Sequence, residues 1–190
     1  MANLLHLARR RHQHGWVTWT APDQSRTDPP TVAGERAALD GWLDYHRSTL
    51  LAKCQGLTGE ELAQRAVPPS SLSLLGLVRH MTDVERAWFR IRSAGETGLG
   101  FRYSTGEFPD GDFDFAEPSG AEADLAAFRE ECALARAAMV GRPLDDTFVH
   151  SRYGATIDLR WVYLHMIEEY ARHNGHADLL RERIDGVTGD

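Results

Sequence analysis

The segment 158–184 constrains the fold more than any other part of the chain, because it has the pattern of a long buried helix that carries ionisable groups on its apolar side. At about 100° per residue, spacings of four, four and three put four such groups within an arc of roughly 80°. They are His165, Glu169, His173 and His176. The apolar residues on or beside this arc are Leu159, Val162, Met166 and Tyr170. Buried imidazoles and carboxylates are costly without compensation, so this face predicts a divalent metal site inside a helical core.

Length and charge narrow the class of protein. A chain of 190 residues with 42% hydrophobic and 26% charged residues is typical of one globular domain. A formal charge of −7 disfavours nucleic acid and anionic membranes as partners, since both attract basic surfaces. No run reaches the roughly 20 apolar residues that a membrane helix needs. We therefore expect a cytoplasmic protein that acts on small molecules.

The first 30 residues are expected to form an extension, followed by a single domain over residues 31–190. Three arginines lie at residues 9–11, but the apolar stretch beside them is short and no small-residue cleavage site follows, which argues against a secretory signal. A second, weaker candidate metal cluster lies in this extension, weaker because no periodic apolar face fixes its geometry. It consists of His6, His12 and His14.

Four long segments have the apolar spacing of amphipathic helices, and no internal repeat relates them. They span residues 34–55, 73–94, 119–139 and 158–184, with Ser119 as the cap of the third. A capping box from Thr58 to Glu61 predicts a short helix after the first. Cys54 and Cys132 fall at apolar helical positions, so we expect both in the core rather than in disulfides. This order of elements predicts an all-α four-helix bundle.

Two connections break the helical pattern. Residues 95–118, between the second and third helices, form a long loop rich in Gly, Asp and Phe. A loop of this length either covers a pocket or is a surface excursion held by its aromatic side chains. Residues 143–156 contain Phe148–His150, for which we predict a short extended piece.

A catalytic zinc site takes three protein ligands and leaves a fourth position open. Glu169 and His173, one turn apart, can reach a common point, and a third ligand should come from a neighbouring helix. His80 on the second helix is the first candidate and His46 on the first helix is the next. In the alternative interpretation the histidines are hydrogen-bonded core residues, and Glu168 and Glu169 belong to a solvated face. A glutamate one turn before a histidine, with a buried histidine elsewhere, favours the metal site.

Two stretches resemble the DinB-like superfamily of metal-binding four-helix bundles. They are Leu77–Glu85 and Glu168–Asp178, and the resemblance extends over residues 28–186. Further short motifs are similar to a branch described only as a domain of unknown function, close to the mycothiol-dependent maleylpyruvate isomerases and thiol S-transferases. These motifs are Asp28-Pro29-Pro30, Glu35-Arg36 and Arg160-Trp161.

The resemblance implies a ligand set. In that superfamily one histidine of the second helix and two ligands one turn apart on the last helix hold the metal, and these match His80, Glu169 and His173. The mycothiol-dependent maleylpyruvate isomerases resemble this chain in using glutamate at the position of Glu169. His176 stands where many relatives carry glutamine, so it is expected to line the pocket rather than to bind the ion.

The resemblance also implies a chemistry, in which a low-molecular-weight thiol such as mycothiol is held as thiolate and attacks a small-molecule electrophile. Zinc is the expected ion, with Fe²⁺ and Ni²⁺ as alternatives. His165 and His176 are the candidate proton carriers. Two other functions stay open, namely hydrolysis by metal-activated water and a non-catalytic stress or accessory protein that binds metal for structure.

The charged residues beside the candidate ligands each have two possible roles. Arg79 and Arg172 either bind a carboxylate of the thiol or of the substrate, or make surface ion pairs. Asp83 and Glu85 either accept hydrogen bonds that orient the ring of His80 or lie on the solvent-exposed face of their helix.

Several aromatic residues are expected at the edge of the pocket or on an exposed contact surface. Trp88 and Trp161 are predicted core anchors that border the pocket. Helical bundles of this kind often pair through helix faces, so a homodimer stays open, with Trp16, Trp19 and Phe101 as candidate exposed contacts.

Overall fold

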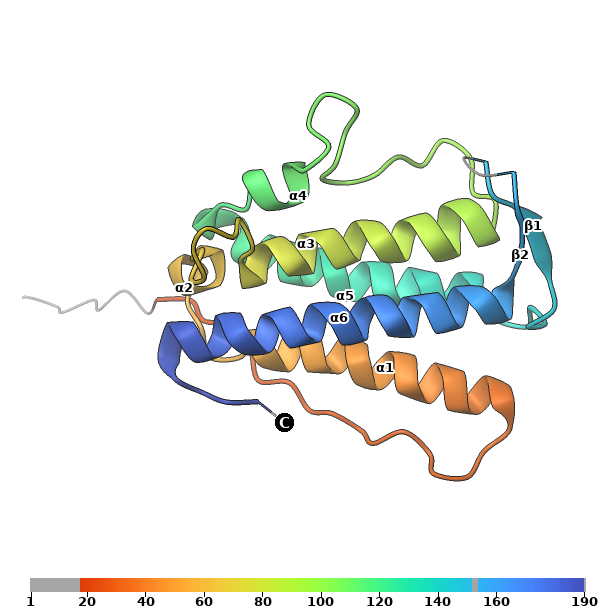
Figure 1. Ribbon diagram of the computed structural model, residues 1–190, viewed down its shortest axis with the longest axis horizontal. Coiled ribbons are helices and arrows are strands. Elements are labelled where there is room, and N and C mark those ends of the chain that lie inside the picture. Colours follow the sequence, from red (N-terminus) through yellow and green to blue (C-terminus); the bar gives the residue numbers. More distant parts are fainter. Residues whose placement is uncertain (1–17, 152–153, 190) are drawn as a thin grey trace, which may run out of the picture.

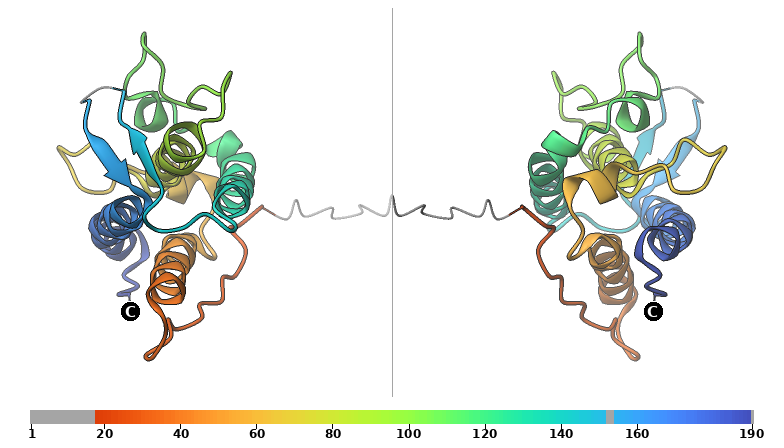
Figure 2. Two further views of the ribbon diagram at one scale, coloured as in Figure 1. Left: turned by 90° about the vertical axis from the view of Figure 1, so that its right-hand side faces the viewer. Right: turned by 90° about the vertical axis from the view of Figure 1, so that its left-hand side faces the viewer.

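Four long helices lie along one another and make the described chain mostly helical, as predicted (Figure 1). The computed structural model describes residues 18–151 and 154–189. The long helices are α1 (Glu35–Cys54), α3 (Leu74–Glu85) with its continuation η1 (Arg86–Ser93), α5 (Ala121–Ala138) and α6 (Leu159–Asp185). Helix α1 packs against α6, and α3 packs against both α5 and α6, as the end-on views of Figure 2 show.

Short elements join the long helices. They are α2 (Gly59–Ala63), α4 (Gly111–Asp114), the 3₁₀ turn η2 (Pro118–Gly120), β1 (Thr147–Val149) and β2 (Thr156–Asp158). The predicted capping box of α2 is confirmed, since Thr58 accepts from the Glu61 amide and Glu61 accepts from the Thr58 amide. The extended piece pairs antiparallel with β2, a strand too short for the periodicity to reveal. The cap predicted at Ser119 is wrong, because that residue lies within η2 and α5 begins at Ala121.

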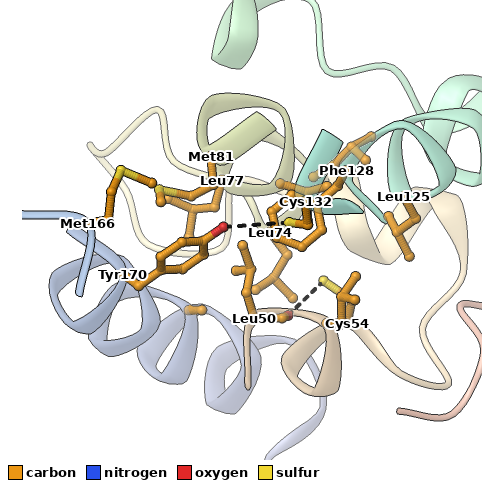
Figure 3. Packing of buried hydrophobic residues seen from close by; sticks show 14 of the residues in the cluster. Leu50, Cys54, Leu74, Leu77, Met81, Leu125, Phe128, Cys132, Met166 and Tyr170 are labelled. Atoms are coloured by element: carbon orange, nitrogen blue, oxygen red, sulfur yellow. Dashed lines mark hydrogen bonds between the residues drawn. The ribbon is translucent and has the colours of Figure 1, made fainter. Parts of the chain in front are cut away.

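Apolar side chains of all four long helices meet in one core (Figure 3). Burying a leucine-sized side chain contributes about 1.5–3 kcal/mol each, so this core holds the helices in register. Both cysteines are free and buried within it, as predicted. Burial raises the pKa of the Cys54 and Cys132 thiols to about 12, so neither is a thiolate near neutral pH.

The second long helix widens into π-helical turns over Arg86–Ser93. The Ala94 amide donates to the carbonyl of Phe89, five residues earlier, at 2.9 Å. The apolar stripe predicted at α-helical spacing therefore breaks here, because Phe89 enters the core while Ile91 is only half-buried. Such π-helical turns occur often beside functional sites.

Both interpretations of Asp83 and Glu85 are wrong, because each carboxylate is buried and each accepts hydrogen bonds from residues other than His80. Glu85 accepts hydrogen bonds from Arg47 and Tyr170 inside the core. Asp83 accepts backbone hydrogen bonds from three successive residues of the long loop, at 2.6, 3.0 and 3.0 Å. Each acid joins parts of the fold that lie far apart in sequence.

The residues before α1 run back along the protein. Ala21 is buried and exchanges backbone hydrogen bonds with Leu57 and Gly56, each at 2.8 Å. Trp19 packs against the core, which corrects its expected exposure. The N-terminal histidines and Trp16 lie outside the described residues, and the division into extension and domain stays a prediction. None of the described helices is both long enough and apolar enough to cross a membrane.

Candidate metal centre

One histidine of α3 meets a glutamate and a histidine of α6. Single ligand atoms of His80, Glu169 and His173 all lie within 4.8 Å of one another. The two imidazole centroids are 4.8 Å apart at 62°, so the rings meet edge to face. All three residues are half-buried at the junction of the two helices. The geometry therefore brings together the three residues predicted as ligands.

Helix α4 holds the ring of His80. His80 Nδ1 lies 2.7 Å from Asp112 Oδ2, and the Phe113 ring stacks on the imidazole with centroids 5.3 Å apart. A carboxylate accepts hydrogen bonds, so Asp112 places the imidazole proton on Nδ1 and leaves Nε2 bare for another bond. Sequence reasoning missed Asp112, and its only signal was the Asp-rich run within the long loop.

The Glu169 carboxylate lies between two imidazoles of its own helix. Its Oε2 is 3.4 Å from His173 Nε2, and its Oε1 is 3.6 Å from His165 Nε2. Residues four apart face each other on a helix, which is why both histidines reach the same carboxylate. With Glu168, His165 and Glu169 also form a second His/Glu group among the described residues.

His173 has the character of a metal ligand. Burial and the neighbouring rings of His80 and His176 lower its pKa to about 4, so the imidazole is neutral near pH 7. Its Nδ1 is buried and has no hydrogen-bond partner among the described residues. Two imidazoles and one carboxylate suit Zn²⁺ and also Fe²⁺, so the residues present fit a divalent ion.

The other predicted histidines surround this group. His165 stacks on Trp161 with centroids 4.9 Å apart and meets Trp88 edge to face at 4.6 Å, and burial lowers its pKa. His176 contacts the ring of His173 at 5.4 Å. His46, the second candidate for the third ligand, lies against Asn174 and belongs to neither His/Glu group of the described chain.

The two arginines differ in their surroundings. Arg79 donates to the backbone carbonyls of Gly111 and Asp112 and to the Asp124 carboxylate, at 2.9 to 3.0 Å. These bonds use most of its donors and leave little capacity for a ligand. Arg172 is exposed and pairs with Glu168 one turn earlier. Ligand binding by either arginine stays a prediction.

Two hollows open at His80, with Trp88 and Arg92 common to their walls. The larger has a volume of about 1090 Å³ and runs from Glu169 to the β1–β2 hairpin. The smaller, about 290 Å³, lies beneath the long loop, which confirms that this loop covers a pocket. Trp161 borders the larger hollow as predicted, but it is 45% exposed and so is not a core residue.

The family described as mycothiol-S-transferase matches residues 38–186. Comparisons with curated proteins and with solved structures each gave no match. The match runs from α1 to the end of α6 and includes every residue of the His80, Glu169 and His173 group. The chain therefore belongs to the mycothiol-S-transferase family.

Proposed function

We propose that the protein is a metal-dependent S-transferase that uses mycothiol or a related low-molecular-weight thiol. His80, Glu169 and His173 are its metal ligands in this proposal, and zinc is the first choice of ion. The observation that carries the proposal is the meeting of these three side chains within 4.8 Å beside an open hollow, in a chain of this family. The packing of α1, α3, α5 and α6 supports a DinB-like four-helix bundle as the scaffold.

A divalent ion at this site would lower the pKa of a coordinated thiol and supply a thiolate at neutral pH. The residues of the chain bind and orient the reactants. His165 lines the larger hollow, and burial keeps its pKa low, so its neutral ring can accept the proton that the thiol loses. His176 lies behind His173 and is the second candidate for moving a proton.

The two hollows offer separate places for the two reactants. Polar side chains of Thr147, Thr156 and Asp158 line the larger hollow, which suits a polar thiol. Apolar side chains of Val84, Phe101 and Phe113 line much of the smaller one, which suits the less polar electrophile. In both places a reactant would lie beside His80.

Two alternatives use the same group. Hydrolysis by metal-activated water needs the same open coordination position and a base such as His165. A purely structural metal protein needs a closed site with four protein ligands. The family match supports thiol transfer over the first, and a three-residue group beside a hollow supports catalysis over the second.

The test combines metal analysis with a transfer assay. Purified protein is loaded with Zn²⁺, dialysed and analysed for bound metal, and wild type is expected to keep one ion. His80→Ala is expected to lose it, whereas His46→Ala, which removes a half-buried histidine outside the group, keeps it. Loaded wild type should then couple mycothiol to a chromogenic electrophile. Equal metal retention by wild type and His80→Ala would overturn the ligand set, and a loaded enzyme without thiol transfer would overturn the activity.

A further inference from the structure

We propose that Asp112 is a positioning residue, which orients His80 for metal binding. The segment 101–113, called the clamp below, holds Asp112 against His80. The inference rests on the ligand set proposed above. A metal-bound histidine commonly donates the N–H of its other ring nitrogen to a carboxylate, which fixes the ring and its tautomer. Asp112 Oδ2 lies 2.7 Å from His80 Nδ1, and its side chain is only 6% exposed.

The clamp is attached by buried charges. Asp83, one turn after His80 on α3, accepts the backbone amides of Arg102, Tyr103 and Ser104. Arg79 of α3 donates to the carbonyls of Gly111 and Asp112, which fixes the backbone of α4 against α3. Residues on both sides of His80 in sequence therefore hold the loop, so α4 has a defined position over the imidazole.

A third anchor lies on α5. Asp124 accepts from Arg79 at 3.0 Å and from the Tyr103 hydroxyl at 2.8 Å, and the Arg79 guanidinium lies 4.0 Å from the centre of the Tyr103 ring. Both carboxylates at the base of the clamp, Asp83 and Asp124, are buried. Buried carboxylates persist when they are hydrogen-bonded, and here Asp83 accepts three hydrogen bonds and Asp124 accepts two.

Glycines let α4 come this close. A Cβ at Gly76 on α3 would lie 2.7 Å from the Phe113 ring, and a Cβ at Gly111 would lie 2.6 Å from the Tyr103 carbonyl oxygen. Either methyl group would push α4 away from His80. Gly106, in the same loop, has no atom within 4 Å of its Cβ position and offers a matched control.

The first measurement is Zn²⁺ affinity by competition with a chromogenic chelator. Asp112→Ala is expected to weaken binding by about 10–100-fold. Asp114→Ala, on the same short helix but exposed and paired with Arg65, should leave affinity unchanged. Gly111→Ala should weaken binding and Gly106→Ala should not, which tests the clamp without altering Asp112.

The second measurement is the ¹⁵N chemical shifts of His80 in the metal-free protein at about pH 8, where an ordinary imidazole is neutral. Wild type is expected to carry its proton on Nδ1, and Asp112→Ala to lose this preference. A wild-type ring protonated on Nε2, an unchanged tautomer in Asp112→Ala, or affinity of Asp112→Ala within about twofold of wild type would each overturn the inference. His80→Ala separates the two proposals. If His80→Ala retains metal, the ligand set is refuted. If His80→Ala loses metal but Asp112→Ala binds Zn²⁺ as tightly as wild type, only the role of the clamp is refuted.

Discussion

Arg47 and Glu85 form a doubly hydrogen-bonded ion pair in the core, with Nε 2.7 Å from Oε1 and Nη2 2.6 Å from Oε2. The Glu85 side chain is 0% exposed, and Tyr170 of α6 donates its hydroxyl to Oε1 at 2.7 Å. The pair and the phenol link α1, α3 and α6. Burial raises the pKa of Tyr170, so its hydroxyl stays a donor at all ordinary pH values.

Removing one partner of this pair should destabilise the fold strongly. Glu85→Ala removes the buried partner of Arg47 and leaves its guanidinium with the half-exposed Asp44 carboxylate, 2.9 Å from Nη1, so we expect a loss of about 3 kcal/mol in the free energy of unfolding. The double variant Arg47→Met with Glu85→Leu should be more stable than Glu85→Ala, because it removes both charges of the buried pair. Urea unfolding followed by circular dichroism measures both. The exposed pair of Arg65 and Asp114 is the control, and Arg65→Ala should change stability by less than about 1 kcal/mol. A Glu85→Ala variant as stable as that control would contradict the prediction.

Neighbouring glutamates of α6 should differ in their effect on metal binding. Glu169→Gln removes the only carboxylate from the candidate ligand group, so Zn²⁺ affinity should fall by more than the 10–100-fold expected for Asp112→Ala. Glu168→Gln changes an exposed residue paired with Arg172 and should leave affinity within about twofold of wild type, since exposed pairs contribute little. Isothermal titration calorimetry with Zn²⁺ compares the two. Equal affinities for Glu169→Gln and Glu168→Gln would show that Glu169 binds no ion.

Acid should destabilise the metal-free protein through His173. Its pKa is about 4 in the folded chain and 6.5 in its ordinary state. Between these values the unfolded chain binds a proton that the folded chain does not, so stability is fully present above about pH 6.5 and falls as pH drops toward 4. Urea midpoints of wild type and His173→Gln at several pH values test this, and the variant should lose less stability on acidification. Identical pH profiles would contradict it.

The start of α6 should depend on its cap. The Asp158 carboxylate accepts a hydrogen bond from the Trp161 amide at 2.7 Å. Asp158→Ala is expected to cost about 1 kcal/mol of unfolding free energy, whereas Asp158→Asn keeps an acceptor and should cost less. Thermal unfolding of the two variants gives the comparison. If Asp158→Ala has the same melting temperature as wild type, the cap contributes nothing to stability.

The helices and the meeting of the three ligand candidates could be predicted, because both depend on periodicity. Apolar spacing marks the core face of each long helix, and the four-residue step from Glu169 to His173 puts both on one side of α6. The place of His80 among the apolar positions of the second helix pointed to it first, the resemblance to the superfamily agreed, and α3 packs beside α6 as both required.

The surroundings of the ligands could not be predicted in the same way. Asp112 reaches His80 across 32 residues through a loop without periodicity, so its position depends on anchors such as Asp83 and Arg79. The second hairpin strand, β2, is three residues long, too short for alternation to identify. The π-helical turns depend on tertiary contacts that the local spacing of Trp88 and Ile91 does not encode.

The π-helical stretch sets the direction in which the pocket wall faces. A π turn holds one residue more than an α turn, so the side chains that follow are rotated by about 100° from their α-helical positions. Arg92 lies over the ring of Trp88 at 4.5 Å, and both line the two hollows. Deleting a single residue there is expected to restore α-helical winding and turn this cation–aromatic pair away from the two hollows, while the candidate ligands on α3 and α6 keep their places.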